Sequence, residues 1–196
     1  MTDEPAVAVP AIRPQPKLEV LLTAEEIARR VEELARQIET DFAEETPVLI
    51  AMLKGSFIFI ADLCRALHIP HHIDFMAIAA YGTGTSPSGA VRLLKDLSVN
   101  ITGRSVLIVE DIIDSGSTLA YIRRLLAARQ PRRLAVVTLL DKRVSPEPDL
   151  PIEYVGFKIG SGFVVGYGLD LAERYRHLPY IAKLDPSHSE EDTPSV

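Results

Sequence analysis

The most informative segment of the chain reads Val106-Leu-Ile-Val-Glu-Asp-Ile-Ile-Asp-Ser-Gly-Ser-Thr118. It opens as a continuous apolar run, which is typical of a strand buried on both faces of a parallel sheet. Glu110 and Asp111 follow this run, and a turn of small residues then opens a helix. Gly116 allows close backbone approach, and hydroxyl side chains lie beside the free amides of the expected helix start. This combination favours a cradle for a monoester phosphate.

Two interpretations of this turn compete. Asp114-Ser-Gly-Ser, taken alone, is explained as well by an ordinary helix cap, because caps use the same residue types. Glu110 and Asp111 favour a ligand site, since carboxylates directly after a buried strand are costly unless they bind hydroxyls, cations or a ligand. Such acids suit a ligand that presents ribose hydroxyls and carries magnesium. The turn lacks the Lys of a P-loop and the spacing of a dinucleotide fingerprint, so an ATPase or a dehydrogenase fits poorly.

Outward from this segment, apolar runs of strand length alternate with helical patterns. Thr23-Ala-Glu-Glu26 is a capping box, and the apolar residues after it recur on one face of a predicted helix. Further helices are expected from residue 57 to 67 and from 118 to 128. Strands are expected at 48–53, 73–79, 105–109 and 134–140. The pattern predicts an α/β fold in which a mostly parallel sheet is flanked by helices and binds its ligand beyond the carboxyl ends of the strands.

Composition narrows the class of protein. The 196 residues are 47% hydrophobic, which favours one domain, expected at 18–185 between a flexible Pro-rich extension at 1–17 and a flexible acidic tail at 186–196. The formal net charge of -6 argues against a general nucleic-acid or membrane partner and favours a small molecule. Cys64 is the single cysteine, and neither a signal peptide nor a membrane-length apolar run is apparent, so a cytoplasmic location is expected.

The run from Val109 to Thr118 resembles the phosphoribosyl pyrophosphate signature of type I phosphoribosyltransferases, and its residues are most similar to those of the hypoxanthine-guanine branch. Other segments match in family order: Met52-Leu-Lys-Gly-Ser56, Ala80-Tyr-Gly-Thr83, Leu140-Asp-Lys-Arg143 and Phe163-Val-Val-Gly-Tyr-Gly-Leu-Asp170, continuing to Arg176. The resemblance implies the type I fold, with a small hood over the base site. It also implies purine salvage, in which phosphoribosyl pyrophosphate and hypoxanthine or guanine give IMP or GMP plus pyrophosphate, with Mg²⁺ as cofactor. A homodimer or homotetramer is implied as well.

The resemblance assigns roles in and before the turn from Asp114 to Thr118, here called the phosphate turn. Glu110 and Asp111 are expected near the ribose hydroxyls, and Asp114 is expected to face purine N7 and exchange a proton during catalysis. An oxocarbenium-like ribose carries positive charge that nearby carboxylates stabilise, so these assignments are chemically consistent. The residues expected to hold the 5′-phosphate are Asp114, Ser115, Gly116, Ser117 and Thr118.

The base site is assigned to two separate segments. Lys142 matches the residue that donates to the purine 6-oxo group, although by itself a Lys after a buried strand is more often a solvated strand end. Phe163 matches the aromatic residue that stacks on the purine, although an aromatic in this context is more often part of the core. Val164 matches the residue whose backbone contacts the other edge of the ring.

Three further positions are assigned to magnesium and pyrophosphate. Asp170 matches a magnesium carboxylate, acting directly or through water, and Glu110 and Asp111 are additional candidates. Arg176 matches the cation that binds pyrophosphate. Lys54-Gly55 matches a loop that offers backbone and charge to pyrophosphate, often through a non-proline cis peptide.

The Gly- and Ser-rich segment after Ala80 matches a mobile lid, with Tyr81 and Gly82 at its start. Composition alone equally allows an ordinary hairpin loop. Bacterial relatives commonly carry Ser-Ser-Tyr-Gly here, whereas this chain has Ala79-Ala80-Tyr81-Gly82, which removes hydroxyls at the lid hinge. A lid that excludes water would protect an oxocarbenium-like ribose from hydrolysis.

Other functions stay open at this point. A phosphoribosyltransferase for adenine, orotate or uracil would use the same phosphate turn, and a regulator with this fold would bind RNA. Lys142 and Phe163 favour an oxopurine, and the acidic net charge disfavours RNA. His68-Ile-Pro-His-His72 lacks the Cys or Glu spacing of a zinc site and is expected to be a surface turn. An arginine-rich stretch is expected to be solvated surface or a subunit contact: Arg123, Arg124, Arg129, Arg132 and Arg133.

Overall fold

The computed structural model describes residues 17–80, 91–144 and 150–184. The expected lid residues Tyr81 and Gly82 lie outside the described residues, as do the N-terminal extension up to residue 16 and the acidic tail. Within the described ranges, no helix is both long and apolar enough to cross a membrane.

Strand β1 (Leu18–Leu22) leads into helix α1 (Ala24–Asp41) through the predicted capping box. The Glu26 amide donates to Thr23 Oγ1 at 3.2 Å, and the Thr23 amide donates to Glu26 Oε2 at 2.8 Å. These two bonds satisfy donors that a helix start otherwise leaves free. One face of the helix is buried, and it comprises Ile27, Val31, Leu34, Ala35 and Ile38.

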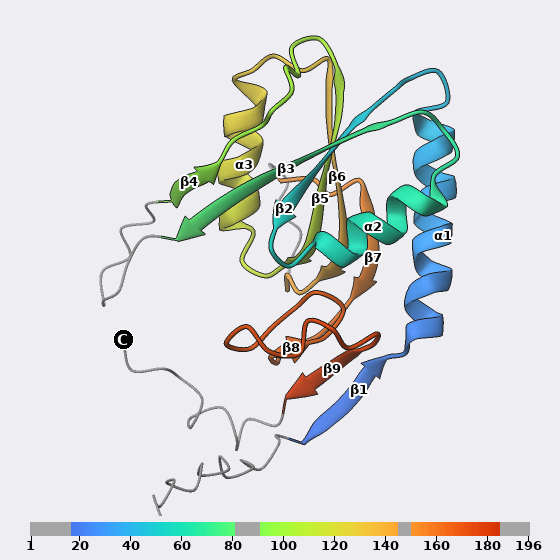
Figure 1. Ribbon diagram of the computed structural model, residues 1–196, viewed down its shortest axis with the longest axis vertical. Coiled ribbons are helices and arrows are strands. Elements are labelled where there is room, and N and C mark those ends of the chain that lie inside the picture. Colours follow the sequence, from blue (N-terminus) through green and yellow to red (C-terminus); the bar gives the residue numbers. More distant parts are fainter. Residues whose placement is uncertain (1–16, 81–90, 145–149, 185–196) are drawn as a thin grey trace, which may run out of the picture.

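The main sheet has six strands in the order β4-β3-β2-β5-β6-β7. All neighbouring pairs are parallel except β3 with β4, which is antiparallel. The parallel strands end along one edge of the sheet, as Figure 1 shows. The six strands are β2 (Val48–Leu53), β3 (His72–Ala80), β4 (Val91–Lys95), β5 (Ser105–Ile113), β6 (Arg133–Asp141) and β7 (Tyr154–Lys158).

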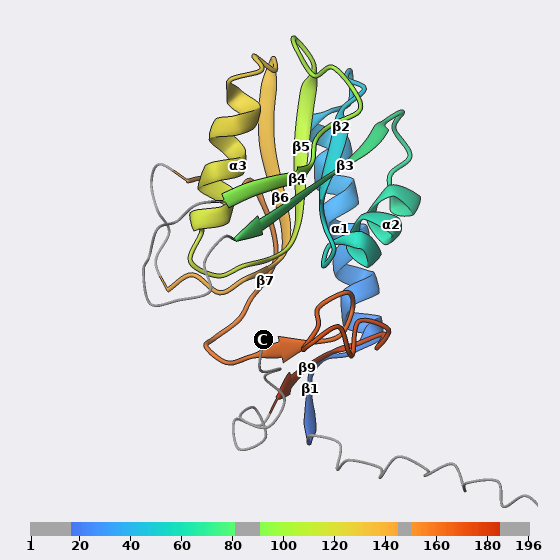
Figure 2. The ribbon, with the colours of Figure 1, turned by 60° about the vertical axis from the view of Figure 1, so that its left-hand side comes forward.

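Helices cover both faces of this sheet, as the two ribbon views show (Figures 1 and 2). Leu107 and Val109 of β5 pack in the cluster that contains residues of α1 and of α2 (Phe57–Ala66). Val106 and Ile108 pack in the cluster that contains residues of α3 (Ser117–Ala127). Because successive strand residues point to opposite faces, a strand between two helical layers must be apolar at every position. This explains the unbroken apolar run of β5.

A second, three-stranded antiparallel sheet lies beyond the carboxyl ends of the main strands (Figure 2). Its strand order is β1-β9-β8, with β8 (Val164–Val165) and β9 (Ile181–Leu184) coming from the C-terminal part of the chain. Tyr167, which follows β8, donates a hydrogen bond of 2.6 Å to Asp62 of α2. This small sheet is the expected hood, and the predicted type I α/β fold is confirmed.

The predicted helices and strands are present, with one correction at β5. The apolar run from residue 105 to 109 was expected to end at the acidic pair, but the strand continues to Ile113. Ile112 and Ile113 pair with Leu140 and Asp141 of β6, so the backbone of the acidic pair remains in the sheet. The phosphate turn therefore begins only after Ile113.

The arginine-rich stretch is engaged within the chain more than expected. Arg129 pairs with Asp96 at 2.7 Å, and Arg132 pairs with Glu45 at 3.1 Å. The Arg133 guanidinium lies 4.0 Å from the centre of the Phe42 ring, a cation–π arrangement. These arginines therefore form ion pairs and a ring contact within the chain.

We predict that Thr23→Ala lowers the free energy of unfolding by about 0.5–2 kcal/mol, because the first turn of α1 loses its side-chain cap. Urea denaturation followed by circular dichroism measures this change. Thr23→Ser keeps the capping hydroxyl and serves as the matched control. Equal stability of the Ala and Ser variants would show that the capping box contributes nothing.

Candidate active site

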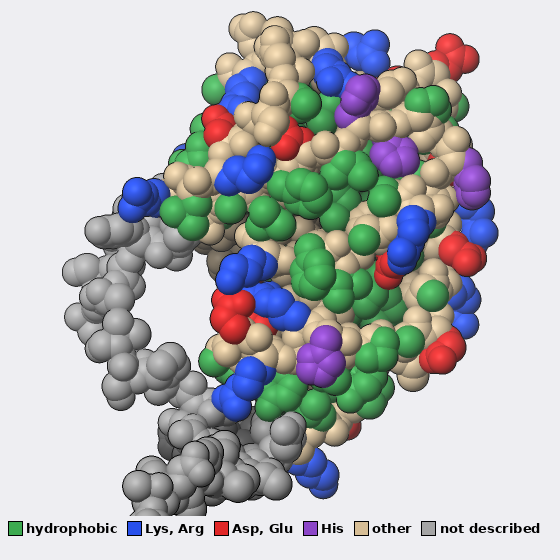
Figure 3. Space-filling view, viewed as in Figure 1, with side chains coloured by type: hydrophobic (Ala, Val, Ile, Leu, Met, Phe, Trp, Pro, Cys, Tyr) green, Lys and Arg blue, Asp and Glu red, His purple; other side chains and the backbone are tan. Residues whose placement is uncertain are grey.

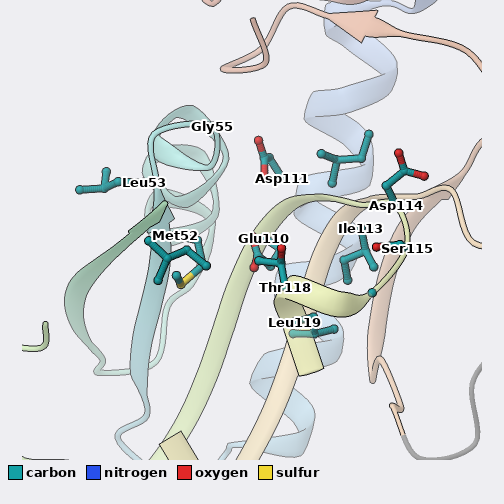
Figure 4. Close-up of a pocket in the computed structure, with 13 residues that line it drawn as sticks. Met52, Leu53, Gly55, Glu110, Asp111, Ile113, Asp114, Ser115, Thr118 and Leu119 are labelled. Carbon is teal, nitrogen blue, oxygen red and sulfur yellow. The ribbon is translucent and has the colours of Figure 1, made fainter. Parts of the chain in front are cut away.

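A cavity of about 250 Å³ opens where β2 and β5 end, in front of the turn into α3. Figure 4 shows its labelled lining residues, with Asp111 and Asp114 directed toward the hood. The acidic pair and most of the phosphate turn therefore line the same cavity. The lining comprises Met52, Leu53, Gly55, Ile78, Glu110, Asp111, Ile112, Ile113, Asp114, Ser115, Gly116, Thr118 and Leu119.

The turn between β5 and α3 has the backbone of an anion site. Gly116 has φ 83°, a left-handed conformation that glycine adopts without strain. A side chain there would also press on Leu150, whose Cδ2 would lie 2.9 Å from an added Cβ. Gly116 is the N-cap of α3 and has no side chain to cap the helix, while the Ser117 amide donates to Ser115 Oγ at 3.4 Å. The turn Asp114-Ser-Gly-Ser thus forms the start of the helix, with Gly116 rather than Asp114 at the N-cap position.

The hydroxyl residues of the turn do not all face the cavity. Ser115 and Thr118 line it, whereas Ser117 does not belong to its wall. Ser117 instead accepts a hydrogen bond from Ser115, with 3.1 Å between the two hydroxyl oxygens. All three side chains are exposed.

Glu110 is a buried acid, and Asp111 beside it is half-buried. Burial raises the pKa of Glu110 well above its usual value, and the neighbouring charge of Asp111 raises it further. Burial also raises the pKa of Asp111 to about 6, although backbone hydrogen bonds and the positive charge of Arg176 oppose this. A Cβ added at Gly55 would overlap the carboxylate of Asp111, so the β2 loop approaches this acid as closely as glycine permits.

Asp114 and Lys142 meet although they come from different strand ends. Lys142 Nζ lies 3.1 Å from Asp114 Oδ2, and the Lys142 amide donates to the carbonyl of Ile113 at 2.9 Å. The Asp114 side chain is 74% exposed and that of Lys142 is 15% exposed. Lys142 is therefore paired and largely covered, which argues against a merely solvated strand end.

Sequence reasoning missed the two residues that hold the turn around Lys142. Arg143 Nε donates to Asp141 Oδ1 at 3.0 Å, and both side chains are less than 10% exposed. Burial favours the neutral acid, but the hydrogen bonds from Arg143 hold the pKa of Asp141 below its usual value. Arg143 also donates to the carbonyl of Leu150, which lies against Gly116. The pair thus links the Lys142 turn to the phosphate turn.

Phe163 and Val164 lie at the start of β8 in the hood. Phe163 is 51% exposed, so it is not a core residue, and Val164 is buried. The Phe163 carbonyl accepts a hydrogen bond from Leu184 of β9 at 3.1 Å, which fixes the backbone beside the ring. An exposed ring on a fixed backbone can stack on a flat ligand.

A cluster of charged side chains joins the hood to the loop after β2. Arg176 Nη2 lies 2.8 Å from Asp170 Oδ1 and 3.4 Å from Glu173 Oε2, and Lys54 Nζ lies 2.9 Å from Glu173 Oε1. The Leu53–Lys54 peptide bond is cis, as the resemblance implied. On the face drawn in the space-filling view, acidic and basic side chains lie next to one another (Figure 3). Sequence reasoning missed Glu173, which carries no motif of its own.

The acids fit magnesium by the chemistry of their donors. Mg²⁺ prefers carboxylate oxygen and uses one or two protein carboxylates plus substrate oxygens. Asp170 Oδ1 forms an ion pair with Arg176, and Oδ2 accepts a hydrogen bond from the Glu173 amide, so a water-mediated contact suits Asp170 better than a dense ligand set. Glu110 and Asp111 add negative charge whose burial a nearby cation would offset.

Known proteins resemble this chain over most of its length. The family model described as "Phosphoribosyl transferase domain" matches residues 18–172. A hypoxanthine phosphoribosyltransferase of Salmonella typhimurium is 51% identical over 85% of this chain and 95% of that protein. A hypoxanthine-guanine phosphoribosyltransferase of Mycobacterium tuberculosis is 51% identical over 85% of this chain and 86% of that protein.

Solved structures agree with the sequence comparisons. A hypoxanthine-guanine phosphoribosyltransferase of Bacillus anthracis, with a HEPES molecule in its active site, superposes with a TM-score of 0.82 at 48% identity. The superposition covers 87% of this chain and all of that one. Family match, sequence identity and fold all lead to the same assignment, and the chain belongs to the phosphoribosyltransferase family.

Proposed function

We propose that this protein is a hypoxanthine-guanine phosphoribosyltransferase of purine salvage. It transfers the 5-phosphoribosyl group from phosphoribosyl pyrophosphate to N9 of hypoxanthine or guanine, giving IMP or GMP and pyrophosphate. The observation that carries the proposal is that one cavity is lined by both the acids Glu110 and Asp111 and the phosphate turn. The names of the similar bacterial enzymes support the choice of base.

Each part of the cavity suits one part of the sugar phosphate. Backbone amides at the start of α3, with Ser115 and Thr118, bind the 5′-phosphate. Glu110 and Asp111 accept hydrogen bonds from the ribose hydroxyls, which supply donors to oxygens that line the cavity. As pyrophosphate leaves, the ribose gains positive charge, and the same carboxylates stabilise that charge in a site of low dielectric.

Asp114 and Lys142 act on the purine. Asp114 is the general base or acid at N7, because it is exposed at the mouth of the cavity and within hydrogen-bonding distance of Lys142. Lys142 donates to the 6-oxo group, and a donor in that place disfavours the amino group of adenine. Phe163 stacks on the ring, and the backbone of Val164 contacts its other edge. This arrangement favours an oxopurine over adenine, orotate or uracil.

Lys54, Gly55 and Arg176 bind the pyrophosphate at the junction of hood and sheet. Asp170 would hold Mg²⁺, directly or through water, with Glu110 and Asp111 as further candidates. When bound, the ion neutralises charge that develops on the leaving pyrophosphate. Lys54 and Arg176 position the pyrophosphate with charge and hydrogen bonds of their own.

The remaining assignments follow from the sequence. We place the enzyme in the cytoplasm as a homodimer or homotetramer, with Tyr81 and Gly82 at the start of a lid, and with segments 1–17 and 186–196 outside a catalytic domain at 18–185. The acidic net charge of -6 supports a small-molecule enzyme over an RNA-binding regulator.

An assay with hypoxanthine, guanine, xanthine and adenine, each with phosphoribosyl pyrophosphate and magnesium, tests the proposed function. Nucleotide is expected from hypoxanthine or guanine and not from adenine. Nucleotide formed from adenine alone would assign the protein to another branch, and no nucleotide from any base would refute the activity.

We predict that Asp114→Asn lowers kcat by about 10²–10⁴, the usual contribution of a general acid or base. The dissociation constant of phosphoribosyl pyrophosphate should change far less, because the amide keeps the shape of the turn. Steady-state kinetics and calorimetry measure the two quantities. Near-normal turnover would refute proton transfer by Asp114.

We predict that Lys142→Ala lowers kcat/KM for hypoxanthine about ten- to hundredfold, the loss expected for a hydrogen bond from a charged donor. The kcat/KM for adenine should change little, so the ratio of kcat/KM for hypoxanthine to that for adenine falls. Lys158→Ala, at the end of the neighbouring strand β7, is the matched control. An unchanged ratio of the two bases would remove Lys142 from base recognition.

We predict that Asp111→Asn stabilises the ligand-free protein at pH 8 by about 1–3 kcal/mol. The pKa of Asp111 is about 6 in the folded state against 3.8 ordinarily, so the folded state binds more protons and stability falls as the pH rises through this window. The gain should therefore disappear near pH 4.

Urea denaturation at pH 4 and pH 8 measures the effect of Asp111→Asn. Glu44→Gln is the control, since it removes an exposed carboxylate outside the site and should change stability by less than about 0.5 kcal/mol. A stability gain that is equal at both pH values would exclude ionisation of Asp111 as its cause.

A further inference from the structure

We propose that Glu173 is an internal substitute for pyrophosphate, which occupies the pyrophosphate-binding cations of the free enzyme and competes with the ligand for them. The inference rests on the proposed function, because it takes Lys54 and Arg176 as the cations that bind pyrophosphate. It adds Glu173 as a residue that weakens this binding and favours release.

The geometry resembles that of a bound anion. The two carboxylate oxygens of Glu173 are divided between the two cations, with Oε1 at 2.9 Å from Lys54 Nζ and Oε2 at 3.4 Å from Arg176 Nη2. A phosphoryl group that bridges the same cations would place two of its oxygens in the same way. Lys54 and Glu173 are 119 residues apart in the chain, so the bridge exists only because the hood folds over the β2 loop.

The backbone holds the carboxylate in this place. Glu173 has φ 63°, and its amide donates to Asp170 Oδ2 at 2.8 Å. Arg176 Nη1 donates to the carbonyl of Gly168 at 2.7 Å, and the Gly168 amide donates to the carbonyl of Arg176 at 3.0 Å. Gly168 in turn lies against the carbonyl of Gly55, which leaves no room for a Cβ. The loop that carries Glu173 is thus fixed beside Lys54.

The carboxylate is nevertheless easy to displace. The side chains of Lys54 and Glu173 are 66% and 64% exposed, and ion pairs between exposed groups contribute little to stability. Arg176 keeps its stronger contact with Asp170 at 2.8 Å when Glu173 leaves. A ligand with several negative charges can therefore take over both cations, but it must displace Glu173 first and then tolerate its charge nearby.

A supporting role of Glu173 in pyrophosphate binding would change the affinity in the opposite direction from a competing role. If Glu173 served to hold Lys54 in the position that pyrophosphate needs, removal of its charge would weaken pyrophosphate binding. If Glu173 competes with pyrophosphate, removal of its charge strengthens binding. Affinity for pyrophosphate itself therefore distinguishes the two roles without reference to turnover.

Isothermal titration calorimetry of the full chain with sodium pyrophosphate in excess magnesium chloride tests the inference. Glu173→Gln should lower the dissociation constant about two- to fivefold, the effect of one exposed charge pair. Glu173→Asn is a second neutral variant, because Asn tolerates a left-handed backbone better than most residues. The inference is supported if either variant binds more tightly and is overturned if neither does.

Glu44→Gln is the matched control, since Glu44 is an exposed acid before β2, at the opposite end of the strand from Lys54, and its removal changes net charge equally. The pyrophosphate affinity of this variant should equal that of the wild type. A gain in affinity of the same size would overturn the inference by showing a general charge effect.

The gain in affinity from Glu173→Gln should shrink between 0.1 M and 1 M salt, since the Debye length falls from about 10 Å to about 3 Å. A gain that persists unchanged at 1 M would overturn the electrostatic basis.

The wild-type assay separates this inference from the proposed function. If the wild type forms no nucleotide from any purine, the proposed function fails and the inference fails with it. If the wild type forms IMP or GMP and neither neutral variant binds pyrophosphate more tightly, the inference alone fails.

Discussion

The parallel pairing of β5 with β2 and β6 is the constraint on which the site depends. It places Glu110 and Asp111 in the sheet, where burial raises the pKa of both acids. Buried acids of this kind are costly unless a ligand supplies hydroxyls or positive charge. In the proposed reaction, a ribose that becomes cationic would supply both, so the two acids that cost stability in the free protein would stabilise the transition state.

The hood completes the site because the main sheet cannot do so alone. The strands end in carboxylates and a phosphate turn, but the base platform at Phe163 and the cation Arg176 come from the C-terminal segment. The Tyr167–Asp62 hydrogen bond and the Lys54–Glu173 ion pair connect this segment to the sheet. In the proposed function, the two sheets of one chain thus bind different groups of the substrate.

Local sequence signals predicted the features that depend on near neighbours. The capping box at Thr23 followed from its residue types and their spacing, and β2 and β6 followed from continuous apolar runs. The turn after β5 followed from its small residues. The end of β5 was misplaced because its last pairs depend on β6, which sequence spacing does not reveal. Glu173 and the Asp141–Arg143 pair were missed because their roles arise only from contacts made in the folded chain. The roles of the lid residues Tyr81 and Gly82 stay predictions.

The contact between Gly168 and Gly55 has a mechanical consequence. At this point two main chains touch with no side chain between them, since a Cβ on Gly168 would overlap the Gly55 carbonyl. Flexible side chains absorb small displacements by changing rotamer, but bare peptide groups in contact do not. A shift of the loop after β2 is therefore transmitted directly to the hood, so these two segments of the chain move together.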